Sequence, residues 1–118
     1  METIENFHSR KLLIGRFYFK KTQNGNLIGE FSHSGSLINL TESADIDGYN
    51  DNFIGNYYTT WQENKLPLSA ELKIEFKPKS GDRIYNLTWK EGGNEIFLGE
   101  GFLFDNILIG DYRNFKVS

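Results

Sequence analysis

Short stretches of alternating apolar and polar residues follow one another between residues 12 and 112, separated by clusters of Gly, Asn, Asp, Ser and Pro. The clearest stretch covers residues 70–77 (AELKIEFK), where every second residue is apolar and every residue between them is charged. Successive side chains of a β-strand point to opposite faces. This stretch therefore predicts a strand with one buried face and one solvated face.

Seven further stretches show the same alternation and are joined by turn sequences. Asn24-Gly25 is a strong signal for a tight hairpin, and Ser80-Gly81 and Gly92-Gly93 mark later turns. We predict strands over residues 12–21, 27–33, 36–41, 53–62, 70–77, 83–90, 96–104 and 107–113. Residues 1–11 are predicted as an N-terminal extension, and residues 42–52 as a polar loop or a single helical turn.

Eight consecutive antiparallel strands either leave two unpaired edges or close on themselves, and closure removes the edges. We therefore predict an all-β fold, an eight-stranded antiparallel up-and-down meander β-barrel that forms one domain over residues 1–118. Composition agrees, because aromatic residues make up 15% of the chain and such side chains suit a half-buried pleated surface.

A repeated unit combines an apolar pair, a glycine, any residue and an aromatic residue. It occurs at residues 13–17 (LIGRF), 27–31 (LIGEF), 53–57 (FIGNY) and 108–112 (LIGDY). Glycine weakens a strand unless the backbone bends or another group approaches closely. The repeated glycines are therefore expected either to permit barrel curvature, with rings lying across them, or to mark where a ligand meets the backbone.

The same units resemble those of the calycin group, which contains lipocalins, fatty-acid-binding proteins and avidins. Gly15-Arg16-Phe17 is similar to the Gly-x-Trp of the first strand in lipocalins and avidins, and Gly29-Glu30-Phe31 resembles a Gly-x-Tyr found in avidins. The resemblance implies a calycin-like barrel that holds a small ligand in a cup. Phe17 stands where those families usually have Trp, so the resemblance implies the cup and not biotin binding.

Charge and composition narrow the expected partners. The net charge is −3 with no basic stripe, so we expect no nucleic-acid partner. The chain has no cysteine, which excludes disulfides and thiolate zinc sites. Because it shows neither a signal-peptide pattern nor an apolar stretch of about 20 residues, we expect a cytoplasmic protein without a membrane partner. His8 and His33 have no metal-ligand spacing, and no catalytic motif occurs, so no metal or cofactor is expected.

Barrels of eight strands can enclose one small ligand or fill with side chains. Our leading hypothesis is a non-enzymatic protein that holds a small hydrophobic or aromatic molecule at the open barrel end. The expected ligand-binding residues are Tyr57, Trp61, Tyr85, Trp89, Glu100, Tyr112, Arg113 and His33. In the alternative interpretation, the same aromatic residues form an ordinary core. Glu100 then forms an ion pair with Arg113 or Arg16 at the barrel rim.

Two alternatives remain open. The cup could belong to an enzyme of the isomerase or cyclase type, with Glu100 or His33 as acid or base. A filled barrel could instead act as a protein-interaction or assembly module, because Tyr18, Tyr58 and Phe102 are expected to face outwards. These outward aromatic residues predict a homo-oligomer, a dimer in the simplest case.

Overall fold

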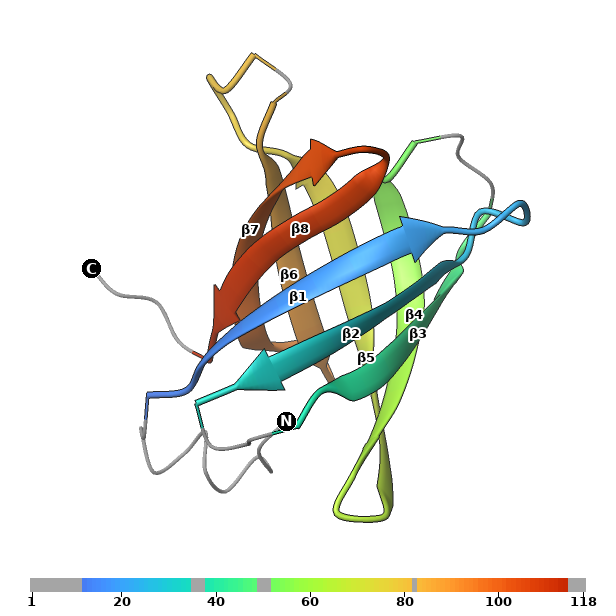
Figure 1. The fold of residues 1–118 in the computed structure, drawn as a ribbon, viewed down its shortest axis with the longest axis vertical. Helices are drawn as coiled ribbons and strands as arrows, with labels where there is room; N and C mark the ends of the chain where they lie inside the picture. Colours follow the sequence, from blue (N-terminus) through green and yellow to red (C-terminus); the bar gives the residue numbers. More distant parts are fainter. Residues whose placement is uncertain (1–11, 35–37, 49–51, 82, 115–118) are drawn as a thin grey trace.

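The computed structural model describes residues 12–34, 38–48, 52–81 and 83–114. Within these residues, all regular structure is β-strand, and each strand pairs antiparallel with the next (Figure 1). The last strand pairs with the first, which closes the barrel. The strands are β1 (Ile14–Lys21), β2 (Leu27–His33), β3 (Leu40–Ile46), β4 (Gly55–Glu63), β5 (Leu66–Phe76), β6 (Tyr85–Glu91), β7 (Asn94–Phe104) and β8 (Ile107–Arg113). The predicted all-β, eight-stranded up-and-down barrel is confirmed.

The third strand differs from its prediction. Residues 42–46 were expected in a polar loop, yet they belong to β3, so the loop prediction is wrong for this part. Glu42 and Ala44 are buried while Ser43 and Asp45 are exposed, so the strand does alternate. The alternation is easily overlooked in the sequence because one inward position carries a carboxyl group. The predicted extension 1–11, positions 36–37 of the predicted third strand and positions 49–51 of the predicted loop lie outside the described residues.

Strand β5 begins at Leu66, four residues before its predicted start. A tight turn at Asn64 and Lys65 connects it to β4, and both residues have positive φ angles of 54° and 66°. Two left-handed residues in succession give the turn whose twist matches a hairpin. Sequence reasoning missed this turn because neither position is glycine.

The core is formed by the inward positions of all eight strands. Ala70, Leu72 and Ile74 are buried, as the alternation of β5 predicts. Ala44, Thr59 and Ala70 face one another in register on β3, β4 and β5 and make one inner wall of small side chains. The large indole of Trp89 reaches from β6 to Glu42 on β3. Large rings against small neighbours give the dense packing that protein interiors require.

Two inward glycines, one of them in the repeated unit, lie beside the ring of Tyr112. Gly15 on β1 and Gly99 on β7 are both register partners of Tyr112 on β8. A Cβ atom at Gly15 would lie 2.3 Å from Cζ of Tyr112, so only glycine leaves room for this ring. Close approach of a neighbouring ring therefore explains Gly15, one of the two roles expected for these residues.

Candidate functional site

All five aromatic residues proposed for the site are buried inside the barrel, but they divide between its two ends. Trp61, Trp89 and Tyr112 lie toward the end where β2 finishes with His33, which we call the His33 end. Tyr57 and Tyr85 lie toward the opposite end, where β1 finishes with Lys21, which we call the Lys21 end. The expected single lining of aromatic residues is therefore two separate clusters.

The cluster at the His33 end is a continuous set of ring contacts. Tyr112 packs against Trp89, Phe97 and Phe31 with centroid separations of 5.8, 5.5 and 6.3 Å. Phe31 extends the contacts to Trp61 at 6.4 Å. Several of these pairs meet edge to face, an arrangement that aromatic quadrupoles favour. Rings thus fill this half of the interior.

Glu42 places a carboxyl group inside this aromatic half. The residue is 1% exposed, and its Oε2 accepts hydrogen bonds from Thr59 Oγ1 at 2.6 Å and from Trp89 Nε1 at 2.9 Å. Burial raises the pKa of Glu42 to about 7, against the opposing effect of these two hydrogen bonds. Glu42 can therefore change its charge near neutral pH, as few carboxyl groups do.

Two further polar groups lie close to Glu42 in the fold. Trp61 is its register partner on β4, and the Trp61 indole N–H is buried without an acceptor among the described residues. The hydroxyl of Tyr112 donates to the backbone carbonyl of Ser32 at 3.2 Å. Burial raises the pKa of Tyr112, and the negative charge of Glu42 raises it further. Tyr112 therefore remains a neutral donor.

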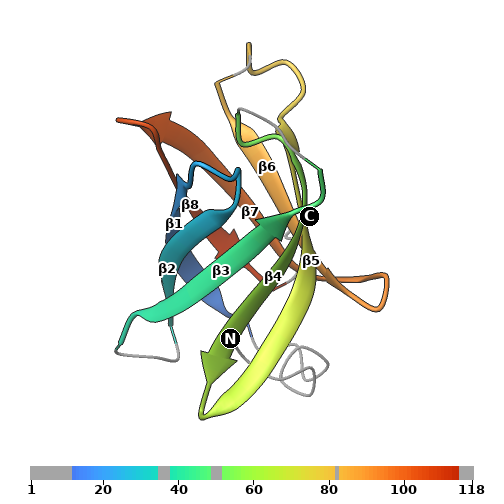
Figure 2. The same ribbon diagram turned by 90° about the vertical axis from the view of Figure 1, so that its right-hand side faces the viewer.

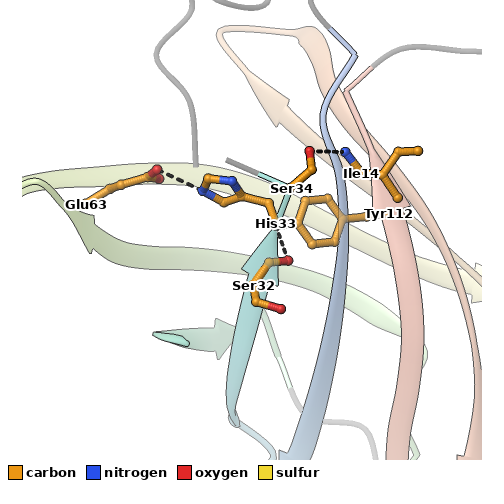
Figure 3. Close-up of polar contacts among 6 residues, drawn as sticks. All are labelled: Ile14, Ser32, His33, Ser34, Glu63 and Tyr112. Atoms are coloured by element: carbon orange, nitrogen blue, oxygen red, sulfur yellow. Dashed lines mark hydrogen bonds and ion pairs between the residues drawn. The ribbon is translucent and has the colours of Figure 1, made fainter. Parts of the chain in front are cut away.

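His33 and Glu63 pair at the rim of the same end (Figure 3). His33 Nε2 lies 3.0 Å from Glu63 Oε2, and both side chains are mostly shielded from solvent. The two residues end β2 and β4. Beside them, the backbone N–H of Ile14 donates to Ser34 Oγ (Figure 3). The structure thus brings an imidazole and a carboxylate to the end of the barrel nearest Glu42.

Glu100 and Arg113 do not join the interior residues. Glu100 lies on the outer surface, is half exposed and pairs with Lys77 Nζ at 2.8 Å. This partner replaces Arg113 and Arg16, the two expected from the sequence. Gly99 and Gly101 take the inward positions of β7, so the residue between them must point out. Arg113 follows the inward Tyr112 on β8 and likewise leaves from the outer face.

The Lys21 end contains fewer polar groups. Tyr57 donates its hydroxyl to the Phe53 carbonyl at 2.9 Å, and burial raises the pKa of this hydroxyl to about 12. The Lys21 ammonium donates to the Tyr57 oxygen at 3.2 Å and lies over the Phe53 and Tyr57 rings. Tyr85 packs against Phe53 and Phe76. These contacts close the end with rings and one cation.

Sequence reasoning missed two of the interior polar residues, Glu42 and Glu63. For Glu42 a signal was present, because Leu40, Glu42, Ala44 and Ile46 continue a period of two through the polar region. For Glu63 the period of two through Tyr57, Thr59 and Trp61 was also present, but the predicted strand ended at Gln62. Its partnership with His33 depends on the barrel, which brings the ends of β2 and β4 together.

Comparisons with protein-family models, with curated proteins and with solved structures find no match for this chain. The closed eight-stranded meander is compatible with the calycin-like fold that the Gly-x-aromatic units suggested. Across the described ranges, no helix is long and apolar enough to cross a membrane. The same ranges contain no cluster of three His, Asp or Glu side chains suited to a metal ion.

Proposed function

We propose that the protein is a non-enzymatic, calycin-like barrel that binds a small organic molecule in the half of its interior around Glu42. The observation that carries this proposal is a buried carboxyl group inside a cluster of aromatic rings. The molecule offers a hydrogen-bond donor to Glu42 and an apolar or aromatic body to the rings of Trp61, Trp89 and Tyr112.

The energetics favour a functional role for Glu42. Taking an ionised carboxylate out of water costs several kcal/mol, and replacing buried ionic groups with apolar side chains of similar volume is often neutral or stabilising. Two hydrogen bonds to Glu42 offset only part of this cost. A barrel selected for stability alone would gain from an apolar residue here. Strongly perturbed carboxyl groups in shielded places are typical of functional sites.

The surroundings of Glu42 match the composition of ligand pockets. Such pockets are mostly apolar and aromatic, with a few polar groups that fix orientation. Here the rings supply the apolar lining and the carboxyl of Glu42 supplies an acceptor. The indole N–H of Trp61, which no described residue accepts, supplies a donor. Because the rings fill this half of the unliganded interior, binding is an induced fit in which rings at the His33 end move apart.

The test is native mass spectrometry of protein purified without denaturation, followed by displacement of a hydrophobic fluorescent dye with a small-molecule library. Wild type is expected to carry or bind one molecule. Glu42→Gln keeps the shape but removes the charge, and we expect at least about tenfold weaker binding, the effect of losing one charge-assisted hydrogen bond. Glu71→Gln on the outer surface is the matched control and should bind like wild type.

Absence of any bound molecule in wild type, combined with no displacement of dye by any library member, would contradict the proposal. Equal binding by wild type and Glu42→Gln would contradict the role of Glu42. Circular dichroism of each variant checks that the barrel is intact.

A second candidate function, an acid–base enzyme that uses the same interior, is favoured by the His33–Glu63 pair. A carboxylate beside an imidazole fixes its orientation and suits it to proton transfer. The molecule recovered from wild type is incubated with wild type and with His33→Gln. Conversion by wild type alone supports the enzyme, whereas recovery of the unchanged molecule from both contradicts it.

A further inference from the structure

The outer surface of β7, β8, β1 and β2 carries two neighbouring rows of mostly apolar side chains. These four strands are neighbours in the barrel, and β8, β1 and β2 lie nearest the viewer in Figure 1. The pairing registers place Tyr18, Ile109 and Phe102 in one row, and Lys20, Ile107 and Phe104 in the next. Phe102 is 49% exposed and Phe104 is 67% exposed. Two large rings therefore stand in water on one face of the barrel.

The opposite outer surface is different in character. It is formed by β3, β4, β5 and β6, and β3 to β5 face the viewer in Figure 2. The groove on this side is lined mainly by charged and amide side chains, among them Asp45, Asp47, Lys73 and Lys90. Of the residues described on this side, one large aromatic residue, Tyr58, is exposed. The rows of apolar side chains thus belong to one side of the molecule, which is typical of an interaction surface.

The closed barrel limits how a partner can approach. Each of the eight described strands is hydrogen-bonded on both sides, so none of them offers an open edge of backbone groups to another chain. A partner of this face must cover side chains, and the apolar rows present the side chains whose burial is most favourable.

The same face also contains a recess. A groove of about 430 Å³ lies across β8, β1 and β2, and its apolar lining includes Tyr18, Ile107 and Ile109. The hydroxyl of Tyr18 donates to the Glu30 carboxylate, which fixes this wall of the groove. Phe104 ends β7, and its register partner is Ile107, a residue of the lining. A projecting ring and a recess that can receive it are therefore neighbours on one face.

We propose that this face is the contact surface of a homodimer, in which Phe104 of each copy enters the groove of the other. A projection beside a matching recess is self-complementary under a two-fold axis, the commonest symmetry of soluble oligomers. The charges of this face are consistent with a second copy. The two bases of the groove, Arg16 and Lys20, are balanced by Glu30 in the groove and by Asp111, the register partner of Arg16. Equal numbers of acids and bases suit a second copy of the same surface, whereas an anionic membrane would call for an excess of bases.

The first test is multi-angle light scattering of the full chain over roughly 1–200 µM. The lower limit corresponds to a binding free energy of about −8 kcal/mol. Wild type is expected as a dimer and Phe104→Lys as a monomer, because lysine replaces the apolar contact with Ile107 and Ile109 by a charged group that is costly to bury. Tyr58→Lys is the matched control, an exposed aromatic residue of the opposite face, and should remain a dimer. Circular dichroism confirms that both variants fold.

Monomeric wild type throughout this range overturns the proposal. So does a Phe104→Lys dimer beside a Tyr58→Lys monomer, which would move the interface to the other face. Wild type that stays monomeric but sediments with anionic vesicles would assign the face to a membrane and overturn the dimer.

The second test uses the absence of cysteine in the chain, which makes single-cysteine labelling unambiguous. Nitroxide labels at Lys20→Cys on the proposed face and at Lys73→Cys on the opposite face report distances between copies. The Lys20 pair is expected to be closer than the Lys73 pair, and the reverse order overturns the proposal. Small-molecule binding inside the barrel should be unchanged in Phe104→Lys, so the dimer and the binding function are tested separately.

Discussion

The two ends of the barrel interior are both packed with aromatic rings, yet they differ in what the rings surround. At the His33 end the rings enclose Glu42, and the Trp61 indole N–H has no acceptor within the described part of the chain. At the Lys21 end, fully buried Leu27 and Leu108 form an apolar interior, and the Lys21 ammonium stays at the rim. The Lys21 end contributes stability through apolar packing. The His33 end instead buries a carboxyl group, and packing alone does not require the desolvation cost of that group.

The largest expected effect is the loss of stability on substituting Gly29. This residue lies between the two halves of the interior, because its register partners are Phe19 and Glu42. A Cβ atom there would lie 1.8 Å from the Tyr18 carbonyl oxygen, a backbone atom of the adjacent strand. We expect Gly29→Ala to lose at least about 4 kcal/mol of unfolding free energy or fail to fold. Denaturant titration measures this loss.

The control for Gly29→Ala is Gly92→Ala. No heavy atom lies within 4 Å of a Cβ at Gly92, but its φ of +57° is left-handed. Strain of this kind costs about 1–2 kcal/mol. If the two substitutions proved equally mild, close strand approach at Gly29 would not limit the barrel.

The next effect tests the apolar end. Leu108→Ala removes a fully buried side chain, and such changes cost about 2–5 kcal/mol through lost burial and the cavity left behind. Leu103→Ala, on the same hairpin but 42% exposed, should cost less than about 1 kcal/mol. Equal losses at the two positions in thermal or denaturant unfolding would mean that the Lys21 end is not the stable half.

The polar end should make stability depend on pH. The folded-state pKa of Glu42 is about 7 against an ordinary 4.5, so between these values the folded state binds more protons than the unfolded state. Stability therefore falls as the pH rises from about 4.5 to about 7, by roughly 3 kcal/mol for this one group. Urea unfolding at pH 5 and pH 8 measures the difference.

Glu42→Gln should remove this part of the pH dependence. At pH 8 we expect it to be more stable than wild type by about 1–3 kcal/mol, because no charge remains buried. Near pH 5 the variant and wild type should be similar. A variant that is less stable at both values would show that the hydrogen bonds of Glu42 outweigh the burial of its charge.

The smallest effect concerns the Tyr112 hydroxyl. Tyr112→Phe keeps the ring over Gly15 and removes only the hydrogen bond to the Ser32 carbonyl. A loss of about 1 kcal/mol is expected from unfolding curves. A loss above about 3 kcal/mol would mean that this hydroxyl belongs to a larger polar network at the His33 end.

The sequence is sufficient for the architecture because strand alternation and turn residues are local signals. Residues 70–77 and the Gly-x-aromatic units identify inward positions correctly. The candidate site is harder, because it depends on partners from distant strands. Trp61 and Trp89 were identified as inward residues, but Glu42 was assigned to a loop since its strand is mostly polar. Glu100 sits among apolar neighbours in the chain, although its pleat position directs it to solvent.

Because Trp89 donates a hydrogen bond to Glu42, tryptophan fluorescence reports on one half of the barrel interior. The chain has two tryptophans, and both indoles lie in the interior toward the His33 end. Tryptophan emission therefore reports on the surroundings of Glu42 and not on the Lys21 end. Ionisation of the Glu42 carboxyl, or binding of a small molecule between the rings, changes the electric field at the Trp89 indole, which is hydrogen-bonded to that carboxyl.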